Sequence, residues 1–131
     1  MGDQLCQEFQ ETVATYLMRH QSILDILSKC QESTSRVNQA VTRSVTSCGC
    51  LSVHAEKIQL PIDAELVNLR NYYSTHLVGD ICPMCRENVE LEMGKALFYL
   101  TALCTTLDIS LEDILTKEKD KVLMLGKFNL T

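Results

Sequence analysis

The sequence contains few of the residues that interrupt regular structure: two prolines and five glycines among 131 residues. Because these residues mark most turns and breaks, their scarcity predicts a few long elements. Internal repeats and low-complexity segments are also missing. A chain of this length, with 46 % hydrophobic residues, can bury one compact core but scarcely two. We therefore expect a single domain over residues 1–131.

An excess of positive charge is also lacking. The net charge of −5 and the pI near 5.1 leave no bulk basic surface to neutralise phosphates, which argues against nucleic acid as a partner. No run approaches the roughly 18 apolar residues of a membrane span. Residues 1–10 lack the cationic start and apolar run of a secretory signal. We expect a cytoplasmic protein with no membrane partner.

Cysteine, by contrast, is abundant, with seven in the chain. The odd number argues against a closed disulfide framework. Without an export signal, we expect reduced thiols that serve as metal ligands or redox groups. Free cysteine is among the most buried residue types. On that ground, three of the seven are expected to be ordinary buried thiols: Cys6, Cys30 and Cys104.

The other four form two closely spaced pairs, Cys48-Gly-Cys50 and Cys82-Pro-Met-Cys85. Two such pairs are typical of a tetrahedral soft-metal site, because each pair supplies two ligands to one ion. Pro83 suits the first turn of a helix, whose dipole and free amides favour thiolates. The sequence predicts zinc as the cofactor, with an iron-sulfur cluster on the same residues as the alternative.

The first pair poses a geometric problem. On an ideal helix, Cys48 and Cys50 point about 200° apart, so both face one ion only if the backbone deforms, which Gly49 permits. On a regular helix, Cys50 and His54 would share a face, and His54 would replace Cys48 as the ligand. Two other interpretations stay open: the thiols hold no ion, or the second pair is a thiol-disulfide motif, for which the usual β-α-β surroundings are missing.

Apolar residues at three- and four-residue steps predict an all-α fold, a bundle of four to five helices with a cysteine-rich metal-binding segment. Ser110, followed three residues later by Asp113, predicts a cap at the start of the last helix. Leu60-Pro61 and Gly79-Asp80 are expected to be breaks. The expected helices cover residues 3–29, 37–51, 63–76, 83–104 and 110–125, with a polar connection at 31–35.

Residues 90–114 read ELEMGKALFYLTALCTTLDISLEDI. This stretch resembles the third helix and following turn of MazG-like nucleoside triphosphate pyrophosphohydrolases, in which an E-x-G-D unit precedes an LFYL-like run and a final helix. The resemblance extends over residues 37–125 and is clearest over 90–115. It implies a MazG-like helical bundle built from two or more subunits, hence a homodimer, and makes a nucleotide a candidate ligand.

Members of that family hold magnesium with an E-x-x-E motif on one helix and an E-x-x-D motif on the next, because magnesium demands oxygen ligands. Here the second motif reads Glu92-Met93-Gly94-Lys95, with lysine at the aspartate position. The first aligns with Ser47-Cys48-Gly49-Cys50-Leu51, with Ser47 and Cys50 at the acid positions. Of the four carboxylates, Glu92 remains. Residues 61–85 lengthen the gap between the motifs, as an insertion would.

The resemblance thus implies a retained fold whose magnesium site has become a site for a softer ion. We expect a metal-binding protein with a structural or regulatory role, in which no residue is assigned to catalysis or to an organic cofactor. The alternative is a magnesium-dependent pyrophosphohydrolase that converts nucleoside triphosphates to monophosphates and pyrophosphate. It would use Glu92 with Glu87 or Glu90 and acids from a neighbouring subunit.

Overall fold

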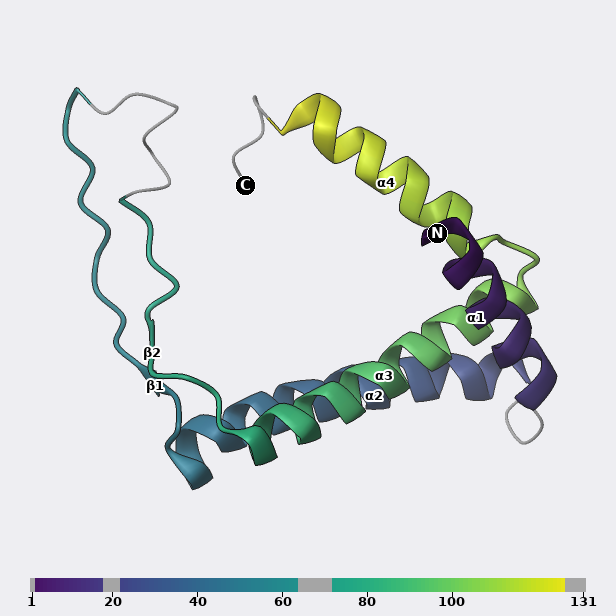
Figure 1. Cartoon of the computed structure of the whole chain (residues 1–131), viewed down its shortest axis with the longest axis horizontal. Coiled ribbons are helices and arrows are strands. Elements are labelled where there is room, and N and C mark those ends of the chain that lie inside the picture. The colour runs from purple at the N-terminus through teal and green to yellow at the C-terminus, as the bar shows by residue number, and fades with distance from the viewer. Residues whose placement is uncertain (1, 18–21, 64–71, 127–131) are drawn as a thin grey trace. The chain divides into compact units, whose positions relative to one another are not determined.

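The computed structural model describes residues 2–17, 22–63 and 72–126. This part contains four α-helices, α1 (Gly2–Tyr16), α2 (Ile23–Arg43), α3 (Pro83–Thr106) and α4 (Leu111–Leu125) (Figure 1). Two short strands, β1 (Ser52–Val53) and β2 (Leu77–Val78), lie between α2 and α3. The described chain is therefore mostly helical, as the apolar periodicity predicts. None of these helices is both long enough and apolar enough to cross a membrane.

The single helix predicted over residues 3–29 is wrong, because α1 ends at Tyr16 and α2 begins only at Ile23. The connection predicted at 31–35 is wrong for the opposite reason, since this segment lies inside α2. Two of its three hydroxyl groups are satisfied locally: Ser33 and Thr34 both donate to the Cys30 carbonyl at 3.0 Å. A hydroxyl that bonds within its own helix costs little to bury, and Ser33 is buried.

The helix predicted over residues 37–51 is the end of α2 and a π-helical turn, η1 (Ser44–Cys48). It does not reach residue 51, because the chain reverses at Gly49. Of the helix predicted over residues 63–76, positions 64–71 lie outside the described residues, and positions 63 and 72–76 are not helical. The two remaining helix predictions are confirmed: α3 begins at Pro83, and α4 follows Ser110.

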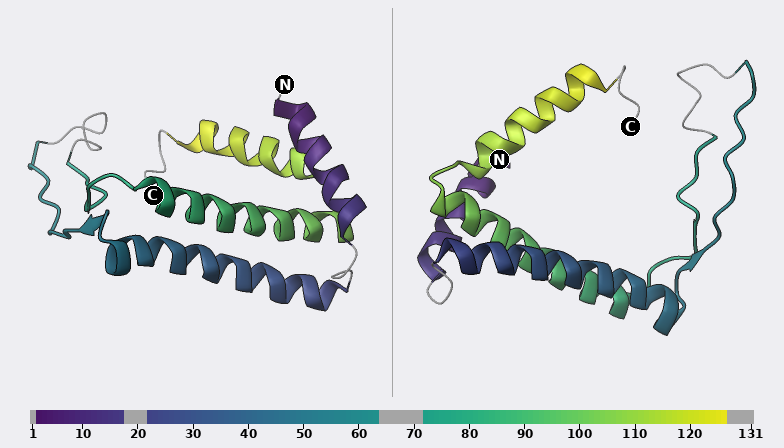
Figure 2. Two further views of the ribbon diagram at one scale, coloured as in Figure 1. Left: turned by 60° about the horizontal axis from the view of Figure 1, so that its bottom comes forward. Right: turned by 180° about the vertical axis from the view of Figure 1, so that it is seen from behind.

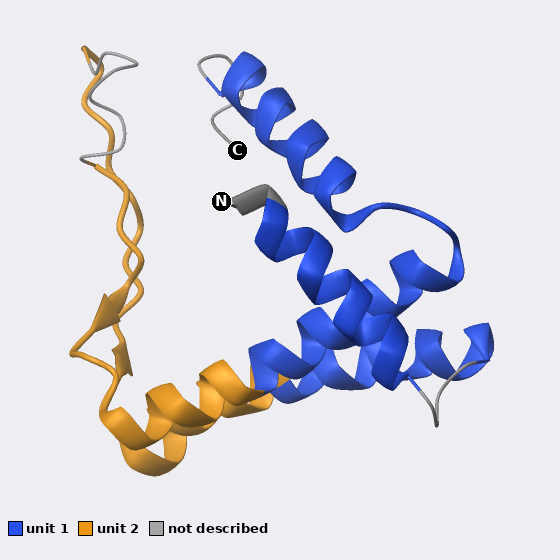
Figure 3. Ribbon diagram, turned by 45° about the vertical axis from the view of Figure 1, so that its right-hand side comes forward, with its two compact units in different colours: residues 1–36, 92–131 blue, residues 37–91 orange. Residues whose placement is uncertain are grey.

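The chain divides into two compact units, residues 1–36 with 92–131 and residues 37–91 (Figure 3). The first unit has a small core of Val13, Ile26 and Ala102, each at most 1 % exposed. Half-buried apolar side chains surround this core: Phe9, Leu17, Cys30, Phe98 and Leu103. α1, α4 and parts of α2 and α3 therefore form this unit.

The second unit contains the end of α2, η1, the strand pair and the start of α3. α2 and α3 lie side by side and antiparallel, and each has one end in this unit (Figure 2). β1 and β2 are antiparallel, with Ser52 opposite Val78 and Val53 opposite Leu77. All four paired cysteines lie in this unit, so the strand pair connects the two segments that carry them.

Candidate metal centre

The backbone around Gly49 allows Cys48 and Cys50 to face the same point. The Ser44 carbonyl accepts the amides of Gly49 at 3.0 Å and Leu51 at 3.3 Å, so the helix closes on this one oxygen. Gly49 has φ of 80°, in the left-handed region that glycine enters without a Cβ clash. The chain therefore turns back after Cys48, and the Cys48 and Cys50 side chains do not point in opposite directions as they would on a regular helix.

Cys82 and Cys85 lie at the N-terminus of α3, where backbone amides have no partner within the helix. The Cys85 amide donates to the Cys82 sulfur at 3.4 Å, and the Arg86 amide donates to the Cys82 carbonyl at 2.9 Å. Cys82 thus occupies the place that serine or aspartate takes as a helix cap. Pro83, the first helical residue, has no amide proton to satisfy.

The strand pair brings the two cysteine pairs together. β1 begins two residues after Cys50, and β2 ends four residues before Cys82, so the register of the strands fixes their distance. Gly79 follows β2 with φ of 95°, and a Cβ there would lie 2.5 Å from the Cys50 carbonyl oxygen. Only glycine fits this close approach without a shift of the backbone.

The sulfur atoms of Cys48, Cys50, Cys82 and Cys85 all lie within 4.8 Å of one another. Those of Cys48 and Cys82 are 3.8 Å apart. Four sulfurs bound to one zinc ion at about 2.3 Å form a tetrahedron with edges of about 3.8 Å. The four thiols therefore have the right ligand atoms and nearly the right spacing to hold one soft metal ion.

The electrostatics of the thiols favours a cation at their centre. The pKa of Cys82 is lowered to about 7, first because the Cys85 amide donates to its sulfur. The pKa of Cys85 is raised to about 12, first because its thiol is hydrogen-bonded to Cys82. One sulfur thus ionises near neutral pH while its neighbour keeps its proton. A second and third negative charge at this spacing require a positive ion between them.

His54, the alternative ligand, does not belong to this group of four. Its backbone amide donates to the His76 carbonyl at 2.7 Å. The residue lines a separate hollow of about 170 Å³ together with Tyr72 and His76. The set of ligands that the structure brings together is therefore the four cysteines.

Glu92, the carboxylate retained from the family motif, has an ion pair of its own. Its Oε1 lies 3.7 Å from the Lys95 ammonium, and its side chain is 20 % exposed. Glu87 and Glu90 are exposed on α3. Within the part of the chain that is described, no three carboxylates come close enough to share an ion. The described residues therefore do not form the carboxylate site that magnesium would need.

The three remaining cysteines differ in burial. Cys104 is buried, whereas Cys6 and Cys30 are half-buried, and all seven thiols in the chain are free. Burial raises the pKa of Cys30, with a further contribution from Cys104, and burial also raises the pKa of Cys104. These two thiols therefore remain protonated and pack as small apolar groups, as predicted.

The sequence predicts the ligands but misses the parts that position them. The Ser44 carbonyl and the strand pair carry no chemical signature, and Gly79 is predicted only as a break, not as a close contact with the Cys50 carbonyl. Two-residue strands are too short for a periodicity to appear. No family model, curated protein or solved structure matches this chain.

Proposed function

We propose that the protein binds one zinc ion through the four cysteines and uses it in a structural or regulatory role. The observation that supports this proposal is the mutual distance of at most 4.8 Å among the four sulfur atoms. A site with four protein ligands leaves no open position for water or substrate, which is typical of structural rather than catalytic zinc.

The spacing favours a single ion over an iron-sulfur cluster. In a [4Fe–4S] cluster each cysteine binds a different iron, and this sets the sulfurs farther apart than the ligands of one ion. The separation of 3.8 Å between Cys48 and Cys82 suits one ion. Zinc is the commonest ion in closed sites with four thiolates and brings no redox chemistry of its own.

The role of the ion follows from the weakness of the strand pair. β1 and β2 have two residues each, and an isolated two-stranded hairpin is at best marginally stable in water. The ion joins the end of η1 to the start of α3 at the base of this pair. Zinc binding thus stabilises the hairpin and the adjacent helix ends together. Because its thiolates are oxidisable, the same site suits a regulatory role.

Metal analysis of protein purified without chelator tests the proposal. We expect one zinc per chain by inductively coupled plasma mass spectrometry, and release of this zinc when a mercurial reagent titrates the thiols. Iron at the same stoichiometry would replace zinc in the proposal. A preparation with neither metal, whose cysteines at 48, 50, 82 and 85 all react freely under native conditions, would sink it.

Removal of the ion tests its structural role separately. In hydrogen exchange followed by mass spectrometry, a chelator should increase exchange in β1, β2 and the first turn of α3. Exchange around Val13 and Ala102, in the core of the other unit, should change little. Equal exchange with and without zinc at the strand pair would show that the ion does not hold this segment.

We further propose that the chain is a divergent MazG-like protein that has lost pyrophosphohydrolase activity. The support is the resemblance over residues 90–115 and the succession of helix, short turn and helix made by α3 and α4. The ion pair between Glu92 and Lys95 supports the loss, because an ammonium group beside the carboxylate repels a divalent cation. Pyrophosphate release from nucleoside triphosphates with magnesium or manganese, abolished by Glu92→Gln, would establish the active alternative.

We propose a homodimer as the assembly. Met93, Leu97 and Leu100 follow one another at four- and three-residue steps on α3, and each is about half exposed, at 47 %, 55 % and 49 %. An apolar stripe of this kind is typical of a helix that packs against another chain. Light scattering after size-exclusion chromatography should give twice the chain mass for the wild type and the chain mass for Leu97→Glu. A monomeric wild type would contradict the proposal.

A further inference from the structure

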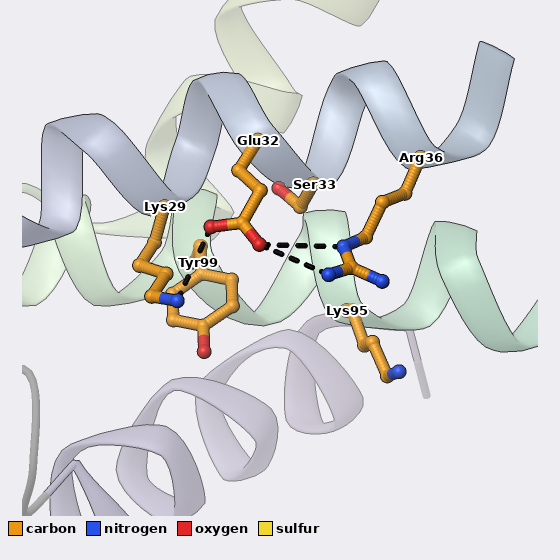
Figure 4. Close-up of a pocket in the computed structure, with 6 residues that line it drawn as sticks. All are labelled: Lys29, Glu32, Ser33, Arg36, Lys95 and Tyr99. Atoms are coloured by element: carbon orange, nitrogen blue, oxygen red, sulfur yellow. Dashed lines mark hydrogen bonds and ion pairs between the residues drawn. The ribbon is translucent and has the colours of Figure 1, made fainter. Parts of the chain in front are cut away.

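A hollow of about 230 Å³ lies between α2 and α3 in the first unit, and none of the four grouped cysteines lines it. Four of its lining residues come from α2 and two from α3 (Figure 4). The six residues are Lys29, Glu32, Ser33, Arg36, Lys95 and Tyr99. All of them belong to the unit formed by residues 1–36 and 92–131.

The charge of this hollow is opposite to that of the whole chain. Three cations and one carboxylate line it, which leaves a formal charge of +2, whereas the chain carries −5. The cations come from two helices, with Lys29 and Arg36 on α2 and Lys95 on α3. In an acidic protein, such a local reversal of charge concentrates anions at one place.

Two of the cations are held in position. Glu32 accepts Lys29 at 3.2 Å on one carboxylate oxygen and Arg36 at 3.1 Å on the other, and Figure 4 shows the carboxylate between them. These bonds lower the pKa of Glu32, first through the hydrogen bond from Lys29, so it stays ionised. The Arg36 bonds to Glu32 come from Nε and Nη2. The guanidinium has five N–H groups in all, so this pairing does not use its donors up.

The hydrogen bonds and ion pairs of the other lining residues show which groups can bind an anion. The Ser33 hydroxyl donates to the Cys30 carbonyl at 3.0 Å, so its proton is already used. Lys95 lies 3.7 Å from Glu92, a carboxylate that does not line the hollow. The cationic groups that line the hollow and can bind an anion are therefore the two ammonium groups and the guanidinium.

We propose that this hollow binds a small phosphate anion, held by Lys29, Arg36 and Lys95. Guanidinium and ammonium groups form charge-assisted hydrogen bonds with phosphate oxygens, and the planar guanidinium matches two of them at once. The volume is below the roughly 300–1,000 Å³ of sites for drug-sized ligands, which suits a compact anion. This binding is independent of the zinc site, since none of its residues takes part there.

A titration of the zinc-loaded protein with inorganic phosphate at constant ionic strength tests the proposal. Amide signals of residues 29–36 and 95–99 in ¹H–¹⁵N spectra should shift and saturate. Lys95→Ala should weaken the fitted affinity at least about threefold, in line with a partly exposed charge contact. Glu92→Gln should strengthen it about two- to threefold, because the competing carboxylate beside Lys95 is neutralised.

Two variants serve as matched controls. Lys119→Ala removes an exposed cation on α4 that does not line the hollow, and Lys121→Ala removes a second one. Both should leave phosphate affinity unchanged, with circular dichroism confirming that each variant is folded. Shifts that do not saturate, an equal loss in Lys95→Ala and Lys119→Ala, or tighter binding of citrate than of phosphate would each overturn the proposal.

Discussion

The sulfur atoms of Cys48 and Cys82 lie 3.8 Å apart although 34 positions separate the two residues along the chain. Between them runs a segment whose regular structure, among the described residues, is limited to two strands of two residues each. Holding the two ends of a segment of this length together costs conformational entropy, and four paired strand residues offset little of that cost. The ion proposed above would bind both ends and so would supply the missing free energy, because metal binding is coupled to folding.

The first prediction concerns the ligands. Cys50→Ser should lower zinc affinity by at least roughly 100-fold, since even the loss of a residue that only supports a ligand costs 10–100-fold. Competition with a chromogenic chelator measures this affinity. Cys6→Ser is the matched control, because Cys6 is a half-buried thiol outside the group of four. Similar affinities of the two variants would remove Cys50 from the site.

The second prediction concerns glycine 79. Gly79→Ala should lower the free energy of unfolding of the zinc-loaded protein by more than about 1–2 kcal/mol, the cost of the left-handed conformation alone. The added Cβ would also lie 2.5 Å from the Cys50 carbonyl oxygen, so the backbone beside this proposed zinc ligand would have to move. We therefore expect weaker zinc binding as well, measured by chelator competition.

Two other glycines provide the comparison. Gly49 also has a positive φ, of 80°, but open space around its Cβ position, so Gly49→Ala should cost only the conformational strain of about 1–2 kcal/mol. Gly94 lies within α3 in open space, and Gly94→Ala should stabilise the protein by about 0.5–1 kcal/mol. Urea denaturation gives the three values. An order other than 79, 49 and 94 from most to least destabilising would contradict the described backbone.

The third prediction concerns pH in the metal-free protein. The pKa of Cys82 is lowered from 9.0 to about 7, so its ionised form favours the folded state above pH 9, and this contribution is lost as the pH falls through 7. The pKa of Cys85 is raised from 9.0 to about 12, so its contribution is present below pH 9 and lost as the pH rises through 12. Both contributions are largely present only near pH 9, because that of Cys82 declines from pH 9 to 7 and that of Cys85 declines from pH 9 to 12.

Alkylation with iodoacetamide, located by mass spectrometry, checks these pKa directions. In the metal-free protein the rate at Cys82 should reach half its maximum near pH 7, whereas Cys85 should react slowly at the same pH, because only thiolates are nucleophilic. Zinc should protect both. Faster modification of Cys85 than of Cys82 at neutral pH would contradict the hydrogen-bond arrangement.

The sequence predicts best where a single local signal decides the structure. Pro83 and Ser110 each mark the start of a helix, and both α3 and α4 begin where these residues place them. The grouping of four cysteines is also predicted, because two pairs at short spacing are typical of a soft-metal site, and their sulfur atoms do lie within 4.8 Å of one another. The division between α1 and α2 is not predicted, since Leu17 and Leu24 are seven residues apart and so keep the same face of a continuous helix, whereas α1 ends at Tyr16 and α2 begins at Ile23.

The connection predicted at residues 31–35, a hydroxyl-rich turn of α2, is wrong for a related reason. Serine and threonine favour caps and connections, yet Ser33 and Thr34 bond to the carbonyl of Cys30, and tertiary packing keeps the helix continuous. The sequence shows that Gly49 permits a reversal of the chain, but it does not show that the reversal occurs. The reversal depends on the Ser44 carbonyl and on strands that form only when residues 52–53 meet 77–78, and these are contacts that no local pattern encodes.

The last prediction concerns Gln10, whose side chain joins α1 to the turn between α3 and α4. Its Nε2 donates to the Ile109 carbonyl at 2.8 Å, and its Oε1 accepts the Leu111 amide at 2.9 Å. That amide belongs to the first turn of α4, where it has no partner within the helix. Gln10→Ala should therefore lower the free energy of unfolding by about 1–3 kcal/mol, the cost of leaving such groups unpaired.

Gln7→Ala is the control, because Gln7 makes a hydrogen bond of 3.3 Å to Glu11 within the same exposed helix surface. Its loss should cost less than about 0.5 kcal/mol. Urea denaturation of the two variants, both loaded with zinc, measures the difference. Zinc affinity should be the same in both, since α1 and α4 belong to the unit that does not contain the cysteine ligands. A stability loss at Gln7 as large as at Gln10 would mean that α1 contributes through its helicity alone and that the contact with Ile109 and Leu111 adds nothing.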